Sequence, residues 1–126
     1  MFPGIFDYRC ISKTIRELIK IRASQINKCA FCLNLHTAEA RELGETEQRL
    51  YCLNAWEECE FYTDEEKAAL ELTEHITLIP NHGVPDSLYQ HVRSFFSEEQ
   101  YFELIIIIGQ INTWNRISIS MGNTVK

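Results

Sequence analysis

Residues 97–119 read SEEQYFELIIIIGQINTWNRISI, and this stretch separates an all-helical chain from one that contains a sheet. The run from Ile105 to Ile108 is β-branched throughout and, on propensity alone, fits a buried strand. Two features favour a helix instead. Ser97 and Gln100 have the spacing of a capping box, and apolar residues recur at helical spacing as far as Ile119. Since no partner strand is apparent elsewhere in the chain, we predict a helix over about 97–119.

The rest of the chain also carries helical signals. Apolar residues recur at helical spacing behind capping residues such as Ser12 and Thr63, Gly44 is suited to end a helix, and Pro80 to Gly83 has the composition of a turn. No linker or repeat divides the sequence, so we expect one all-α domain over residues 1–126, a bundle of about six helices. The five further helices are expected near residues 12–27, 29–44, 46–57, 63–79 and 85–96.

Composition and charge restrict the partners and the location. The 126 residues include 18 acidic and 12 basic side chains, a formal charge of −6, which gives no basic surface for nucleic acid. Met1 to Cys10 lacks the charged start and long apolar run of a secretion signal, so we expect a cytoplasmic location. The apolar run from Leu104 to Ile108 is too short to span a membrane. Because it is apolar on most faces, we expect another subunit to cover it in a homo-oligomer.

The cysteines point to redox or metal chemistry. Their odd count, at positions 10, 29, 32, 52 and 59, argues against a secreted disulfide framework, so reduced thiols are expected. One pair is close, in the stretch CAFCLNLH at residues 29–36. On a helix, Cys29, Cys32 and His36 share one stripe about 100 degrees wide with Leu33, Ala40 and Leu43. Both thiols and the imidazole are therefore expected on a buried face.

Three physical effects make this stretch a plausible redox site. Cys29 lies where unpaired backbone NH groups and the helix dipole favour an anion, so thiolates here are expected to form below the ordinary thiol pKa of about 8.5. His36 is one helical turn after Cys32 and can accept the thiol proton. The three-residue spacing of the cysteines places their α-carbons within the range of roughly 4.4–6.8 Å that a disulfide requires.

These abilities fit the reduction of a peroxide. A thiolate attacks the peroxide oxygen and becomes a sulfenic acid, a second thiol condenses with it to form a disulfide, and an external dithiol resets the pair. We assign the attack to Cys32, which is nearer His36. We assign resolution to Cys29, because its terminal position is more accessible to a reductant.

Two other interpretations of the pair stay open on spacing alone. The two cysteines and His36 could be three ligands of a zinc site in a structural module, and His36 could be a hydrogen-bonded core residue. Structural zinc usually takes four ligands, and Cys52 and Cys59 have six residues between them rather than two to four, which weakens the zinc alternative. Haem attachment is excluded because Leu33, not histidine, follows the second cysteine, and no strand pattern supports a thioredoxin fold.

The stretch IRASQINKCAFCLNLHTAEAR, residues 21–41, closely resembles the core of the AhpD-like alkylhydroperoxidases within the carboxymuconolactone decarboxylase superfamily. The resemblance extends through WEE at 56–58, residues 61–69, HGVPD at 82–86 and INTWNR at 111–116, so it covers most of the chain. It implies an all-α fold, assembly into homo-trimers or homo-hexamers, and peroxide reduction through the paired cysteines.

The resemblance also adds a residue that periodicity does not reveal. The proton relay of the family uses a glutamate twelve residues before the first cysteine, and Glu17 occupies that position here. On its own helix Glu17 lies beside Ile21 and Ser24, nearly opposite the main apolar stripe, which by itself indicates an exposed carboxylate. We assign Glu17 and His36 together to the relay, because a carboxylate near the imidazole has a clear use there.

The sequence departs from the family pattern at Phe31, where the better-known and longer peroxidases carry histidine just before the second cysteine. With phenylalanine at this position, the chain resembles a subgroup of shorter proteins within the family. No bound cofactor or metal is expected, and the resemblance implies an external dithiol reductant, which in related systems is a lipoyl-bearing protein. The decarboxylase branch acts on a lactone without this cysteine pair, and a lyase of that type is the alternative activity.

Other polar and aromatic residues receive no chemical role. Asn112 and Asn115 are considered as pocket-lining residues but are not assigned to the site. We interpret three histidines as surface or packing residues: His75, His82 and His91. We interpret three cysteines as buried hydrophobes: Cys10, Cys52 and Cys59. Core or subunit contacts are expected of Trp56, Trp114 and Arg116.

Overall fold

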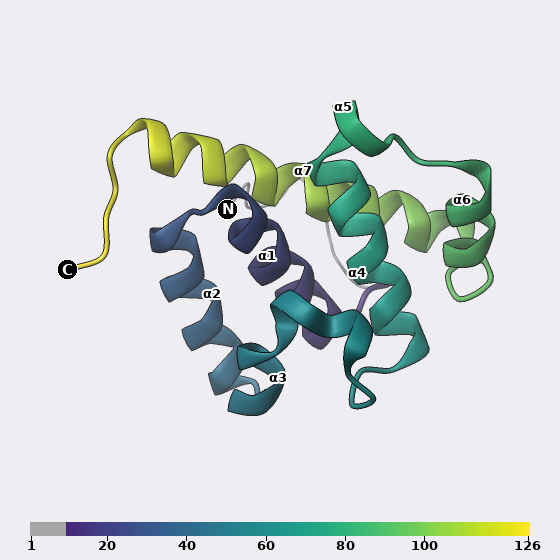
Figure 1. Ribbon diagram of the computed structural model, residues 1–126, viewed down its shortest axis with the longest axis horizontal. Coiled ribbons are helices and arrows are strands. Elements are labelled where there is room, and N and C mark those ends of the chain that lie inside the picture. The colour runs from purple at the N-terminus through teal and green to yellow at the C-terminus, as the bar shows by residue number, and fades with distance from the viewer. Residues whose placement is uncertain (1–9) are drawn as a thin grey trace.

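The computed structural model describes residues 10–126, and this part of the chain is helical without a strand (Figure 1). The all-α prediction is confirmed. The elements are α1 (Lys13–Asn27), α2 (Ala30–Glu42), α3 (Glu47–Tyr51), a 3₁₀-helix η1 (Leu53–Glu58), α4 (Asp64–Thr77), α5 (Ile79–His82), α6 (Asp86–Arg93) and α7 (Glu98–Ser120).

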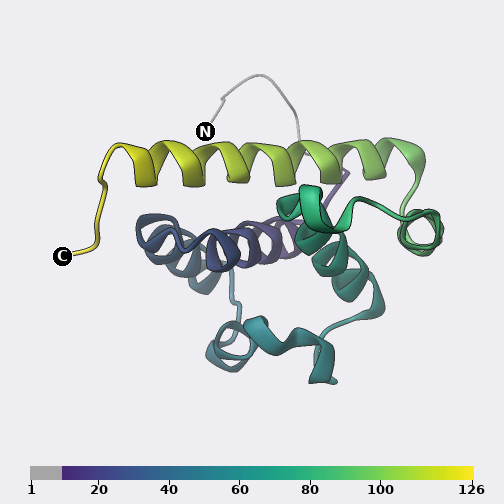
Figure 2. The ribbon, with the colours of Figure 1, turned by 45° about the horizontal axis from the view of Figure 1, so that its top comes forward.

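Helix α1 lies at the centre and packs against α2, α4 and α7. In Figure 2 the long helix α7 runs along the top, with α1, α2 and α4 beneath it and α3 below them. Side chains from α1, α4, α6 and α7 form one apolar cluster, and side chains from α1, α2, η1 and α4 form a second. Helix α1 contributes to both clusters, so it is buried on more faces than a single apolar stripe predicts.

The sequence signals for helix ends are confirmed. Ser12 caps α1 through Ile15 N, Thr63 and Glu66 form the predicted capping box of α4, and Ser97 and Gln100 form that of α7. These side chains satisfy backbone NH groups that have no partner within the first helical turn.

Two predicted segments differ from the structure. The helix expected over 46–57 is divided into α3 and η1, with a non-helical Ala55 inside the 3₁₀ segment. The apolar spacing of Leu50, Leu53 and Trp56 is three residues, which is the period of a 3₁₀-helix rather than an α-helix. The turn expected over 80–83 lies mostly in the short helix α5, which begins at Ile79. The described residues thus form eight helical segments rather than about six.

No helix within residues 10–126 combines the length and the apolar character needed to cross a membrane.

Candidate active site

The cysteine pair lies at a tight connection between α1 and α2. Lys28 ends α1 in the left-handed conformation with φ of 58°, and the backbone NH of Cys29 donates to Ser24 O at 3.0 Å. Cys29 then caps α2, because its Sγ accepts from the backbone NH of Cys32 at 3.4 Å. The connection turns the chain sharply and brings both cysteines to the side of α2 that faces the interior.

Both thiols are free and buried, with exposed fractions of 1% for Cys29 and 4% for Cys32. Burial raises the pKa of Cys32 to about 11, and the neighbouring Cys29 thiol adds to the rise, while hydrogen bonds with Asn115 and Ser118 act in the opposite direction. The sequence-based expectation of a lowered thiol pKa is therefore wrong for Cys32. Removal of the sulfur from water outweighs the favourable field of the helix terminus.

His36 lies one turn beyond Cys32 and is also buried, with 3% of its surface exposed. Its Nδ1 is 3.5 Å from Glu17 Oε2 and 3.3 Å from Glu39 Oε2. Glu17 comes from α1 and Glu39 from the next turn of α2. One imidazole nitrogen, Nδ1, therefore faces two carboxylates, and Nε2 is the ring nitrogen that these carboxylates do not engage.

Glu17 is buried, with 8% of its surface exposed, although its position opposite the apolar stripe indicates exposure. The reason is that α2 packs on this second face of α1. Burial alone raises the pKa of Glu17, but the interactions with His36 and with Lys20, whose Nζ lies 3.4 Å from Oε1, outweigh it and leave that pKa below its usual value. Glu17 is thus held as a carboxylate beside the imidazole.

An apolar pocket of about 250 Å³ opens beside the second cysteine. Cys32 and His36 both line it, whereas Cys29 does not. The other lining residues are Phe31 and Leu35 from α2, Trp114, Ile117 and Ser118 from α7, and Asn123. The pocket brings a small molecule within reach of one thiol of the pair and of the imidazole.

A polar network fixes α7 against the cysteine connection. Asn115 is fully buried and its Nδ2 donates to Ser24 Oγ at 2.9 Å. Asn27 Nδ2 donates to Asn115 Oδ1 and to Asn112 Oδ1, each at 2.9 Å. Buried amides with satisfied partners are rigid positioning elements, so the network holds Cys32 against α7.

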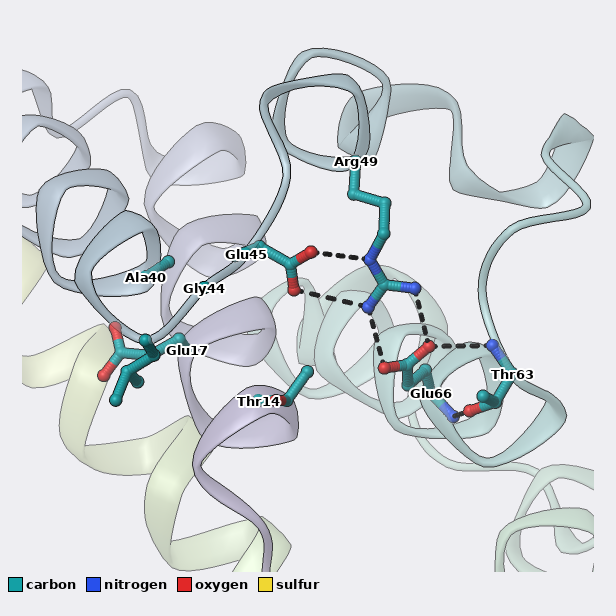
Figure 3. Close-up of a pocket in the computed structure, with 9 residues that line it drawn as sticks. Thr14, Glu17, Ala40, Gly44, Glu45, Arg49, Thr63 and Glu66 are labelled. Atoms are coloured by element: carbon teal, nitrogen blue, oxygen red, sulfur yellow. Dashed lines mark hydrogen bonds and ion pairs between the residues drawn. The ribbon is translucent and has the colours of Figure 1, made fainter.

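Glu17 also lines a second, polar pocket of about 300 Å³ (Figure 3). At its centre Arg49 donates to Glu45 Oε1 at 2.7 Å and to Glu66 Oε2 at 2.8 Å. Glu66 also accepts from the backbone NH of Thr63. Glu17 therefore lies beside the imidazole and also lines this polar pocket.

The structure brings together the four residues that the sequence selects, Glu17, Cys29, Cys32 and His36, and adds Glu39 and Ser118 beside them. Asn115 contacts Cys32 without lining the pocket. Glu39 has a sequence signal, since it is three residues after His36 on the same helix. Ser118 has none, because no local pattern identifies which residues of a distant helix face the thiol.

The zinc interpretation built on the cysteine pair does not match the positions of the side chains. Within residues 10–126, three possible metal-ligand atoms lie within 4.8 Å of one another at Glu17, His36 and Glu39, and the thiols are not part of this group. Among the residues interpreted as buried hydrophobes, Cys10 is exposed, and Cys52 and Cys59 are half-buried. Trp56 packs in the core, as expected, and donates to Glu74 at 2.9 Å.

Comparisons with known proteins place these features in a family. The uncharacterised protein YdfG of Bacillus subtilis is 67% identical over 113 residues, which cover 90% of this chain and 77% of that protein. YnjA of Escherichia coli, also uncharacterised, is 26% identical over 96% of this chain and 67% of its own length.

Two solved structures are also similar to this chain. A protein of unknown function from Agrobacterium tumefaciens, described as a candidate AhpD antioxidant defence protein, superposes with a TM-score of 0.88 at 37% identity over 92% of this chain and 80% of its own. An uncharacterised peroxidase-related protein from Silicibacter gives a TM-score of 0.78 at 25% identity over 86% of this chain and 57% of its own. Residues 4–75 match the sequence profile of the Carboxymuconolactone decarboxylase family, so this chain belongs to that family and to its AhpD-like members.

Proposed function

We propose that this protein is a thiol-dependent peroxidase that reduces alkyl or hydrogen peroxides through Cys29 and Cys32. The observation that carries the proposal is the arrangement of the apolar pocket, which Cys32 lines together with His36, whereas Cys29 does not line it. An apolar pocket with one reactive sulfur and one base suits a small, weakly polar substrate such as an alkyl hydroperoxide.

In the first step Cys32 attacks one peroxide oxygen. Because burial raises the pKa of Cys32 to about 11, the thiol needs a base at neutral pH, and His36 Nε2 takes this proton. The sulfur–oxygen bond forms as the oxygen–oxygen bond breaks, so the sulfur is oxidised to a sulfenic acid. The leaving oxygen takes the proton back from His36 and departs as an alcohol or as water.

In the second step Cys29 resolves the sulfenic acid. Its thiol is in direct contact with the Cys32 thiol, so the disulfide forms with little movement while one water leaves. An external dithiol then reduces this disulfide by thiol–disulfide exchange. The dithiol gives up two electrons and leaves as a disulfide. The resemblance to AhpD-like proteins makes a lipoyl-bearing protein the proposed reductant.

Glu17 completes the relay. Its carboxylate lies 3.5 Å from His36 Nδ1 and therefore stabilises the imidazolium that forms when the thiol loses its proton. Glu17 also lines the polar pocket around Arg49, which offers a route for protons to reach solvent away from the apolar pocket (Figure 3).

We further propose that the protein works in the cytoplasm as a homo-oligomer, a trimer or a hexamer. Phe31, Leu35 and Ile117, which line the apolar pocket, are 43%, 41% and 40% exposed. An apolar rim of this kind around a functional pocket favours cover by a neighbouring subunit. Light scattering coupled to size-exclusion chromatography measures the assembly directly.

The test is peroxide consumption with dithiothreitol as the dithiol. The wild-type protein is expected to turn over and Cys32→Ser to be inactive. In a separate reaction without dithiothreitol, pre-reduced Cys29→Ser is expected to consume one equivalent of peroxide and to keep a sulfenic acid that dimedone traps. Cys10→Ser is the matched control, because Cys10 is exposed and outside the pair. Turnover by Cys32→Ser at the wild-type rate would exclude the proposed attacking role.

A further inference from the structure

The side chains of Glu17, His36 and Glu39 converge on one point between α1 and α2. The distances from His36 Nδ1 are 3.5 Å to Glu17 Oε2 and 3.3 Å to Glu39 Oε2, and all three atoms lie within 4.8 Å of one another. Two carboxylates and one nitrogen ligand therefore face each other in a partly enclosed position. Like charges at this separation repel each other unless a cation lies between them.

Hydrogen bonds within this cluster leave one buried carboxylate oxygen without a donor. Glu17 Oε2 is buried and accepts no hydrogen bond, although Oε1 of the same carboxylate accepts one from Lys20 Nζ at 3.4 Å. A neutral imidazole has at most one hydrogen on Nδ1, and Glu39 is the carboxylate placed to accept it. When that hydrogen points to Glu39, Glu17 Oε2 faces His36 Nδ1 at 3.5 Å without receiving a hydrogen, and a buried acceptor of this kind calls for another electropositive partner.

The distances match those around a tetrahedral metal ion. Bonds of about 2.0–2.2 Å from zinc to nitrogen and oxygen place neighbouring ligand atoms about 3.3–3.6 Å apart in a tetrahedron. The two measured distances from His36 Nδ1, 3.5 and 3.3 Å, agree with this edge. The third edge of the tetrahedron joins the carboxylate oxygens of Glu17 and Glu39. Rotation of the Glu39 side chain, which is 45% exposed, brings these two oxygens to the same separation.

We propose that Glu17, His36 and Glu39 form a binding site for a divalent transition-metal ion of the zinc type, with water from the open side as the fourth ligand. One imidazole and two carboxylates suit zinc and its first-row neighbours, whereas magnesium and calcium prefer six or more oxygen ligands. Lys20 orients Glu17 from outside the cluster, as outer partners do around metal ligands. Binding here needs no peroxidase chemistry, and a bound ion occupies the two residues assigned to the relay.

The test is titration of the fully reduced protein, freed from reductant under anaerobic conditions, with Zn²⁺ in a calorimeter and with Co²⁺ in a spectrophotometer. We expect one ion per chain and visible cobalt bands without the intense near-ultraviolet band of a sulfur-to-cobalt bond. Glu39→Gln is expected to weaken binding roughly tenfold or more, since it removes one of three ligands. Glu42→Gln, an exposed residue one turn along the same helix, is the matched control and is expected to bind normally.

The thiol pair provides the decisive comparison. If the ion binds as proposed, the double variant Cys29→Ser, Cys32→Ser keeps the wild-type affinity and cobalt spectrum. Loss of binding in that variant, together with a sulfur-to-cobalt band in the wild type, would assign the ion to the thiols and overturn the proposal. Absence of saturable binding, or equal affinities of Glu39→Gln and Glu42→Gln, would also overturn it.

Discussion

Glu17 Oε2 lies 3.5 Å from His36 Nδ1, so the central helix supplies a carboxylate to the imidazole of its neighbour. Replacing Glu17 by glutamine keeps the shape of the side chain but removes the charge that stabilises the imidazolium. We expect peroxide turnover with dithiothreitol to fall roughly a hundredfold, at the lower end of acid–base effects because Glu17 acts through His36. Glu42→Gln removes an exposed charge from α2 and is expected to keep the wild-type rate. Wild-type turnover by Glu17→Gln would remove this residue from the relay.

Ser118 contacts Cys32 from α7 and its hydrogen bond lowers the pKa of that thiol. We therefore expect Ser118→Ala to raise the pKa of Cys32 above its value of about 11. The loss of one hydrogen bond corresponds to a shift of roughly half to one pH unit. The rate of Cys32 alkylation by iodoacetamide, followed against pH by tandem mass spectrometry, measures the midpoint. Ser120→Ala, two residues along the helix and exposed, is the control, and an identical profile for both variants would contradict the assigned contact.

The contrast between Ser118 and the helix ends shows what a sequence alone can predict. Capping boxes at Thr63 and Ser97 are local, because donor and acceptor are three residues apart, and the sequence places them correctly. The contact of Ser118 with Cys32 joins positions 86 residues apart and depends on how α7 crosses α2. Helical periodicity identifies one apolar stripe and cannot show that a second helix will cover the opposite face, which is why Glu17 reads as exposed.

The same limitation explains why the sequence does not predict the raised pKa of Cys32. The position of Cys29 and Cys32 at a helix start is visible in the sequence, and it predicts a stabilised thiolate. The extent of burial depends on tertiary packing, and burial raises the pKa of Cys32 where the sequence predicts that it is lowered. The sequence therefore predicts where the pair lies, whereas the protonation of Cys32 depends on tertiary packing.

The polar pocket supplies a prediction about stability. Burial raises the pKa of Glu66, but its hydrogen bonds with Arg49 and Thr63 outweigh burial and leave that pKa lowered. A lowered folded-state pKa stabilises the fold above the unfolded value of about 4.3, and this contribution is lost as the pH falls through the folded-state pKa. We expect Glu66→Gln to reduce the free energy of unfolding by about 2–3 kcal/mol at pH 7, with a smaller difference from wild type near pH 3.

Urea unfolding followed by circular dichroism at both pH values measures this difference. Glu65→Gln removes the neighbouring charge, which is exposed, and is expected to change the free energy of unfolding by less than about 0.5 kcal/mol. A difference between Glu66→Gln and wild type that stays constant from pH 7 to pH 3 would show that the carboxylate charge does not contribute.

Asn115 joins α7 to the connection that holds the cysteine pair, and it is fully buried. Its amide donates to Ser24 Oγ and accepts from Asn27 Nδ2, both at 2.9 Å. Asn115→Ala removes the hydrogen bonds to the buried Ser24 and the half-buried Asn27 and opens a cavity, so we expect the free energy of unfolding to fall by about 2–4 kcal/mol in urea titrations. Thr113→Ala, on the exposed side of the same helix, is expected to lie within about 0.5 kcal/mol of wild type.

Because Asn115 also lowers the pKa of Cys32, the Asn115→Ala variant should be alkylated more slowly at Cys32. Equal stability of the two variants would show that α7 is held by its apolar contacts alone.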